Sequence, residues 1–270
     1  MTTNSINAAT NPDLANKLIS EVMEEDTITE KATIVAPSDT LVTLPGGFMP
    51  FDGEVIGTAE VRELTGKDEE AIARASSLSK ALLVVLSRGV VSIGDTPADD
   101  KVLDQLLAGD RDSLMLGIYR ATFGSTAEVG GYCIGCQAVK LVEVDTYGDI
   151  KTKVLVNPAD DRTFTVKGKV NEYLVTLPTG TTQKQIINSE DKNVAELNTI
   201  LLENTVLKIN DASVYNKVQV QNLPITDRKK ILEAIAERNP GPQFDDIVIE
   251  CPDCGGEVAV PIDLGTLFQF

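Results

Sequence analysis

The chain has 270 residues, of which 42% are hydrophobic and 4% aromatic, a composition typical of a soluble globular protein with a real core. Lys and Arg number 24 against 41 Asp and Glu, so the formal net charge is −17. Nucleic acids and anionic membranes are bound through clustered Lys and Arg, so this charge argues against both as partners. No apolar run approaches the roughly 20 residues of a membrane-spanning helix. The polar start is unlike a signal peptide, and we expect the chain to stay in the cytosol.

Histidine is absent from the chain. This excludes Ser-His and Cys-His nucleophilic sites and every mixed Cys/His zinc site. The sequence also lacks a G-x-G-x-x-G turn, a P-loop and a G-x-S-x-G elbow. Catalysis by carboxylates, Lys, Tyr or Cys is still chemically open, but we expect that the protein is not an enzyme.

The second half of the chain repeats features of the first half in the same order, which indicates an internal repeat. The matched positions are Val61 with Val175, Thr65-Gly66 with Thr179-Gly180, Ile72 with Ile186, Asp110-Arg111 with Asp227-Arg228, and Cys133 and Cys136 with Cys251 and Cys254. We therefore predict an α+β fold built from a tandem-duplicated unit, with helices plus small antiparallel β hairpins. The predicted parts are an N-terminal arm (1–43), a first half (44–148), a linker (149–163) and a second half (164–270).

Helical spacing and capping residues predict the local structure of each half. In the first half, Thr65 and Asp68 form a capping pair, and an apolar stripe from Ile72 to Val85 predicts one helix of about five turns. In the second half, the polar stretch 188–193 predicts an interruption of the matching helix. Asp110 and Asp227 are expected to cap a shorter helix in each half.

Outside the two halves, two further segments carry a local prediction. The arm contains a predicted helix from Asn11 to about Glu25, whose apolar stripe could pack on this chain or on a partner. The composition of residues 157–162, at the centre of the linker, predicts a surface turn.

All four cysteines fall in two C-x-x-C pairs, Cys133 with Cys136 and Cys251 with Cys254, each between strand-like segments. One pair supplies half of a tetrahedral shell, and the chain has no histidine to complete it. We therefore predict that the two pairs share a single structural Zn²⁺ ion that joins the halves. Such a closed four-sulfur site would do no Lewis-acid chemistry.

Two other interpretations of the cysteines remain open. The pairs could be disulfides or a redox-active dithiol, although a redox C-x-x-C motif normally opens a helix and the cytosol is reducing. They could also be free cysteines. At the level of function, the corresponding alternatives are an intracellular zinc-ribbon adaptor of nucleic-acid machinery and a C-x-x-C thiol oxidoreductase.

Three stretches of the chain match the pattern of a known protein family. The first comprises Leu44-Pro-Gly-Gly-Phe48, Gly53-Glu-Val and Val61-Arg-Glu-Leu-Thr-Gly-Lys-Asp-Glu-Glu70, and the second is a helical middle that ends in a cysteine knuckle. The third is Glu250-Cys-Pro-Asp-Cys-Gly-Gly-Glu-Val-Ala-Val-Pro-Ile-Asp263, followed by Leu267-Phe268. Together these stretches resemble the T-even-type bacteriophage baseplate proteins, small tail proteins of contractile-tailed phages, and the resemblance covers about residues 44–270. It departs from the family pattern at Cys133-Ile-Gly-Cys136, which lacks the usual Pro and trailing Gly.

The resemblance implies a structural or assembly component of the tail baseplate, close to the hub or wedges, that acts through protein–protein interactions. The implied partners are other phage tail baseplate proteins, with one or several copies of the chain per baseplate and no nucleic acid or membrane. The implied location is the virion tail after assembly in the bacterial host cytoplasm. A role confined to assembly of the hub is the alternative to a place in the finished virion.

Overall fold

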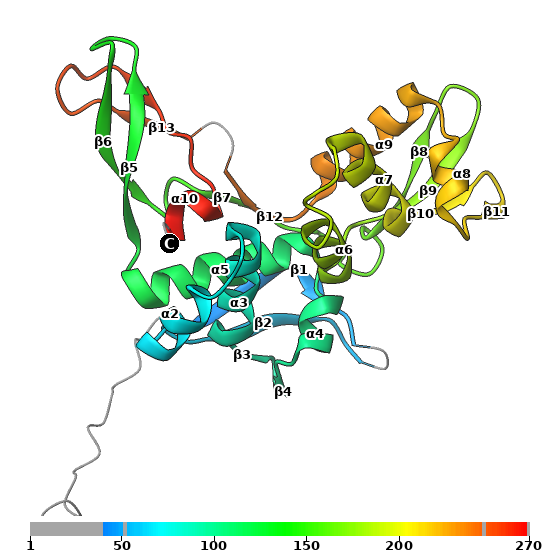
Figure 1. The fold of residues 1–270 in the computed structure, drawn as a ribbon, viewed down its shortest axis with the longest axis horizontal. Coiled ribbons are helices and arrows are strands. Elements are labelled where there is room, and N and C mark those ends of the chain that lie inside the picture. Colours follow the sequence, from blue (N-terminus) through cyan, green and yellow to red (C-terminus); the bar gives the residue numbers. More distant parts are fainter. Residues whose placement is uncertain (1–39, 51–52, 245–246, 269–270) are drawn as a thin grey trace, which may run out of the picture. The chain divides into compact units, whose positions relative to one another are not determined.

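The computed structural model describes residues 40–50, 53–244 and 247–268, and all of them belong to one unit defined by its contacts, Pro37–Phe270. The fold is mixed α+β with antiparallel sheets, as predicted from the sequence (Figure 1). The helix predicted from Asn11 to Glu25 lies outside the described residues.

The first part of the fold is a four-stranded antiparallel sheet with four helices. The strands, in sheet order, are β1 (Leu41–Phe48), β2 (Ile56–Val61), β3 (Val90–Ile93) and β4 (Thr96–Pro97). The helices are α2 (Gly66–Ile72), α3 (Leu78–Gly89), α4 (Asp100–Gln105) and α5 (Ala108–Phe123).

The later part of the chain contains the same types of element in the same order. Its sheet has the order β11-β10-β9-β8, with β8 (Thr163–Lys167), β9 (Glu172–Thr176), β10 (Val206–Ile209) and β11 (Ala212–Ser213). Its helices are α6 (Gly180–Ile187), α7 (Val194–Thr205), α8 (Lys217–Gln221) and α9 (Ile225–Arg238). Both sheets therefore have consecutive strands as neighbours, with a helix pair inserted between the second and third strands.

A third four-stranded sheet combines hairpins that are far apart in the sequence. The first hairpin consists of β5 (Thr126–Cys133) and β6 (Ala138–Asp145), and the second of β13 (Val248–Glu250) and β14 (Glu257–Ala259). They join along β5 and β14 in the order β13-β14-β5-β6, and we call the result the cysteine sheet. The remaining elements are a two-stranded pairing of β7 (Lys151–Lys153) with β12 (Gly241–Gln243), and the C-terminal helix α10 (Leu264–Phe268).

The buried apolar residues form two main clusters. The larger cluster takes residues between Leu44 and Ile150 and also residues between Ile247 and Phe268. The second cluster lies within Val166–Ile235. The C-terminal hairpin and α10 thus share a core with the first part of the chain, although they follow the second part in sequence.

The helix starting after Thr65 is shorter than predicted. Thr65 begins α2 as expected, and both its main-chain N–H and its hydroxyl donate to Asp68 Oδ2 at 2.9 Å. The single helix of about five turns is wrong, however, because α2 ends at Ile72 and a new helix begins at Leu78. The Ser77 side chain caps the new helix by accepting a hydrogen bond from the N–H of Lys80. Because a serine side chain can bond the main chain in this way, it competes with continuation of the first helix and starts a new one. The predicted interruption at 188–193 is confirmed between α6 and α7.

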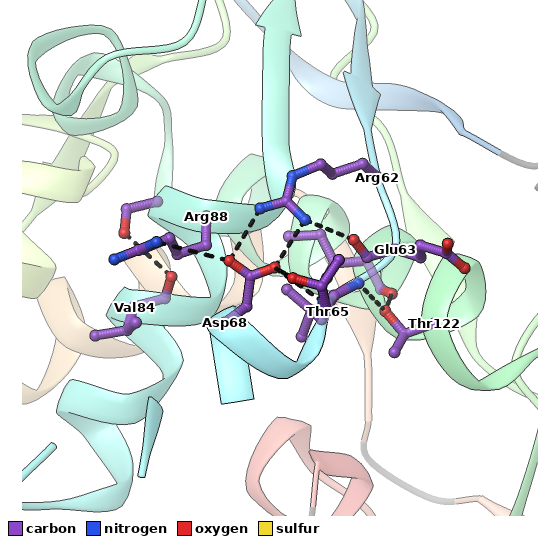
Figure 2. Close-up of polar contacts among 10 residues, drawn as sticks. Arg62, Glu63, Thr65, Asp68, Val84, Arg88 and Thr122 are labelled. Carbon is purple, nitrogen blue, oxygen red and sulfur yellow. Dashed lines mark hydrogen bonds and ion pairs between the residues drawn. The ribbon is translucent and has the colours of Figure 1, made fainter. Parts of the chain in front are cut away.

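Asp68 also ties α2 to the end of strand β2. Its side chain is 2% exposed and accepts from both terminal nitrogens of Arg62, at 2.8 and 3.0 Å (Figure 2). Arg88 at the end of α3 lies 3.8 Å from the same carboxylate. The hydrogen bonds from Arg62, and after them those from Thr65, lower the pKa of Asp68.

The predicted capping roles of Asp110 and Asp227 are wrong. Each is the third residue of its helix and not the capping residue before it. The residues at the capping positions of α5 and α9 make no side-chain hydrogen bond to the helix. Asp110 accepts instead from the main-chain N–H of Gly46 at 2.6 Å. Asp227 accepts from the N–H of Lys169 at 3.0 Å and from the hydroxyl of Tyr173 at 2.7 Å. Asp110 therefore joins α5 to β1, and Asp227 joins α9 to β9 and to the turn before it, a long-range role that local spacing does not reveal. These helices, at 16 and 14 residues, are also longer rather than shorter than the 12-residue α3 and α7.

Candidate metal centre

The four cysteines come together at one end of the cysteine sheet. Cys133 is the last residue of β5 and Cys136 lies in the turn to β6, while Cys251 follows β13 and Cys254 lies in the turn to β14. Their sulfur atoms all lie within 4.8 Å of one another. The two C-x-x-C pairs therefore converge, as the sequence predicts.

The pairing of β5 with β14 explains this convergence. Cys133 lies directly opposite Val258, and both side chains are 0% exposed. Val129 and Val142 face the same side of the sheet and are buried with them. The alternation of buried and exposed residues along β5 fixes its register, because a slip of one residue would turn the Cys133 sulfur to the other face.

The sulfur–sulfur distances fit a tetrahedral metal site. Cys133 Sγ lies 3.6 Å from Cys254 Sγ, and Cys136 Sγ lies 3.8 Å from Cys251 Sγ. A zinc ion with four thiolate ligands at about 2.3 Å places neighbouring sulfurs about 3.8 Å apart. A disulfide needs sulfurs about 2.05 Å apart. All four cysteines are free, and their spacing matches the metal shell rather than a disulfide.

Main-chain amides point toward the sulfurs in both turns. Cys133 Sγ accepts from the N–H of Cys136 at 3.4 Å. The pKa of Cys251 falls to about 7, chiefly because the N–H of Asp253 donates to its sulfur. The pKa of Cys136 rises to about 12 because of its hydrogen bonds with the other sulfurs, that of Cys254 first. Four clustered thiols ionise together only when a cation compensates their charge, which is what a bound divalent ion supplies.

The two turns share one left-handed residue at the same position although their sequences differ. Gly255 follows Cys254 with a φ of +68°, in the left-handed region that glycine favours. Gln137 follows Cys136 and takes the same region, with a φ of +54°. The first knuckle therefore adopts the left-handed region at this position without a glycine. Glutamine gives no sequence signal for this conformation, and Gln137 was not predicted.

One ion pair connects the two hairpins across the sheet. Lys140 of β6 pairs with Asp253 in the turn of the second hairpin, and this contact raises the pKa of Lys140. Sequence spacing did not identify either residue, because the contact exists only once the hairpins pair.

The geometry also bears on the redox interpretation. Neither C-x-x-C pair opens a helix, where the helix dipole would activate a thiol. The close sulfur contacts of 3.6 and 3.8 Å join residues of different hairpins, whereas a C-x-x-C oxidoreductase closes a disulfide within one motif. A four-sulfur shell would leave no open coordination position, so the arrangement suits a structural ion.

Comparison with known proteins gives one match. A family model described as "T4 bacteriophage base plate protein" matches residues 49–269, a range that includes both cysteine hairpins. No curated protein and no solved structure matches the chain. Within the described residues, every helix is too short or too polar to cross a membrane.

Proposed function

The chain belongs to the T4 bacteriophage base plate protein family, and from this premise we propose the part it plays in the baseplate. Membership identifies a structural component of a phage baseplate in the virion tail. Our proposal is that it acts near the hub or wedges as a non-catalytic scaffold, through contacts with other baseplate proteins.

We propose further that the scaffold is a duplicated unit clamped by zinc. The repeated order of strands and helices in the two parts of the chain supports a duplication, as do the matched cysteine pairs. In this proposal Cys133, Cys136, Cys251 and Cys254 hold one structural Zn²⁺ ion. The ion would lock the first hairpin to the second and so join the ends of the duplicated unit.

The observation that carries this proposal is the convergence of four sulfurs from hairpins far apart in sequence. The strand pairing between the hairpins is short: β5 and β14 share the partners Cys133 with Val258 and Tyr132 with Ala259. Structural zinc contributes about 10–16 kcal/mol in small zinc peptides, which exceeds what such a short strand pairing supplies.

Zinc stoichiometry in variants tests the clamp. We expect the purified full-length chain to contain one zinc per molecule by elemental analysis. Cys136→Ser and Cys254→Ser each remove one ligand from a different hairpin, and both should lose most of the metal and melt at lower temperature. Ser92→Ala on β3 is the matched control and should retain the metal. Full zinc retention in either cysteine variant would contradict a shared site.

The composition of phage particles tests the place in the tail. Mass spectrometry of purified tails and of tail-assembly intermediates should find the chain with hub or wedge proteins. Its presence in intermediates but not in finished virions would assign it to assembly alone. Its absence from both would contradict the proposal.

A further inference from the structure

The cysteine sheet has an apolar face that no described part of the chain covers. Strand register places Val248, Ala259, Tyr132 and Val139 in one row across β13, β14, β5 and β6. Residues directly opposite each other lie on the same face of a sheet, so the four side chains form a continuous strip. Leu141, two residues further along β6, extends the strip. We call these five residues the outer face.

The outer face is unusually exposed for its composition. Tyr132 and Val248 are 52% exposed, Leu141 65% and Val139 69%. The opposite face of the same sheet already packs into the core through Cys133, Val258 and Val142. An antiparallel sheet with one buried face normally presents polar residues on the other. A row of apolar side chains across all four strands therefore indicates a surface that becomes covered.

Two acidic pairs flank the outer face, one on each side. Glu250 and Glu257 lie opposite each other at the cysteine end, and Glu128 and Glu143 lie opposite each other at the other end. All four are exposed, and none has a cationic partner within 4.0 Å in the part of the chain that the structure describes. Like charges directly opposite each other destabilise a sheet. The repulsion within each glutamate pair is relieved when a partner brings positive charge to both sides of the strip.

We propose that the outer face binds a segment of a neighbouring baseplate protein in which apolar side chains are flanked at both ends by Lys or Arg. The apolar side chains would cover the strip, and the basic residues would pair with the two glutamate pairs. The inference rests on the proposed function, because it takes the partner from the baseplate. A second copy of this chain fits poorly, since each copy carries a net charge of −17 and four carboxylates at this face.

Incorporation into tails tests the proposal with two kinds of variant. Val139→Ser with Leu141→Ser removes apolar contact, and Glu128→Lys with Glu143→Lys reverses one acidic pair. Each double variant should enter purified tails about tenfold less than wild type when it replaces the phage's own copy. The matched controls are Val170→Ser, at an apolar site that is 87% exposed in another part of the chain, and Glu54→Lys with Glu203→Lys at exposed sites off the sheet. The controls should enter tails as wild type does.

Melting temperature and zinc content of the purified variants separate binding from folding. Glu128 and Glu143 are exposed and lie at the end of the sheet away from the sulfurs, so the charge-reversed protein should melt at the wild-type temperature. If the apolar variant misfolds, the amount of charge-reversed protein in tails tests the proposal by itself. Incorporation of the charge-reversed protein at the wild-type level would overturn the inference. If wild type is itself absent from tails and intermediates, the proposed function fails as well.

Cross-linking identifies the partner without any substitution. A carbodiimide joins a carboxylate to a lysine in direct contact with it, so treatment of wild-type tails should connect Glu128, Glu143, Glu250 or Glu257 to a lysine of another baseplate protein. Cross-links at these positions only to a second copy of this chain would overturn the proposal.

Discussion

Gln137 and Gly255 occupy the same position in the two cysteine turns and share a left-handed backbone, with φ values of +54° and +68°. In each hairpin this left-handed conformation directly follows the second cysteine of the pair. In the first hairpin a residue with a Cβ adopts it, at a cost of roughly 1–2 kcal/mol.

This strain predicts opposite effects of two substitutions. Gln137→Gly should raise the free energy of unfolding by about 1 kcal/mol, because glycine adopts the left-handed region without a steric cost. Gly255→Ala should lower it by about as much. Chemical denaturation in excess zinc measures both. A stabilising Gly255→Ala variant would contradict this account of the turns.

The approach of α5 to β12 predicts a second stability effect. A Cβ on Gly109 would lie 1.6 Å from the carbonyl oxygen of Pro240, so Gly109→Ala forces the two backbones apart. We expect a loss of roughly 3 kcal/mol or more, in the range of severe overpacking. Gly57→Ala is the control, since a Cβ there has open space within 4 Å. Equal melting temperatures for the two variants would show that the close contact does not matter.

The ion pair between the buried Asp68 and the partly exposed Arg62 predicts a stability effect that fades in acid. Asp68 has a pKa below the unfolded value of 3.8, so its charged form stabilises the fold above that pH. Asp68→Asn should cost about 2 kcal/mol at neutral pH, from lost charge-assisted hydrogen bonds. The difference from wild type should stay constant above about pH 5 and shrink as pH falls below about 4. A difference that grows in acid would have the wrong sign.

Asp110 and Asp227 should respond to pH in opposite directions, although they occupy matching positions. Burial raises the pKa of Asp110 to about 6, so the folded state binds an extra proton and loses stability as pH rises from about 4 to 6. The hydroxyl of Tyr173 lowers the pKa of Asp227, whose contribution is therefore lost as pH falls below about 4.

Paired asparagine variants measure the contrast. Asp110→Asn should flatten the slope of stability between pH 4 and 6 and leave the more acidic range unchanged. Asp227→Asn should flatten the slope of stability below pH 4 and leave the slope above pH 4 unchanged. Identical pH profiles for the two variants would refute the difference in environment. Comparing each variant with wild type at the same pH cancels any shared loss of metal.

Local patterns in the sequence predicted the local structure, and contacts between distant segments account for the errors. The Thr65 cap and the break at 188–193 follow from neighbouring residues, and both are present. Asp110 resembled a helix cap because spacing does not reveal Gly46, its distant partner. The convergence of the sulfurs is the one long-range feature that the sequence predicted. Four cysteines in two pairs, in a chain without histidine, leave few ways to complete a metal shell.

The helix break before Leu78 was missed for a different reason. The apolar stripe continues at helical spacing from Ile72 to Val85, so periodicity alone favours one helix. Ser77 competes with that preference by capping a new start. The outer face was also missed, because the register of four strands from two hairpins is needed to see that its residues share one side.

Zinc-edge X-ray absorption of the purified full-length chain tests the shared metal site most directly. The account predicts a single zinc environment with four sulfur ligands at about 2.3 Å. Two sulfurs completed by oxygen or nitrogen around each zinc would show that each hairpin binds its own ion, and that result would contradict the clamp.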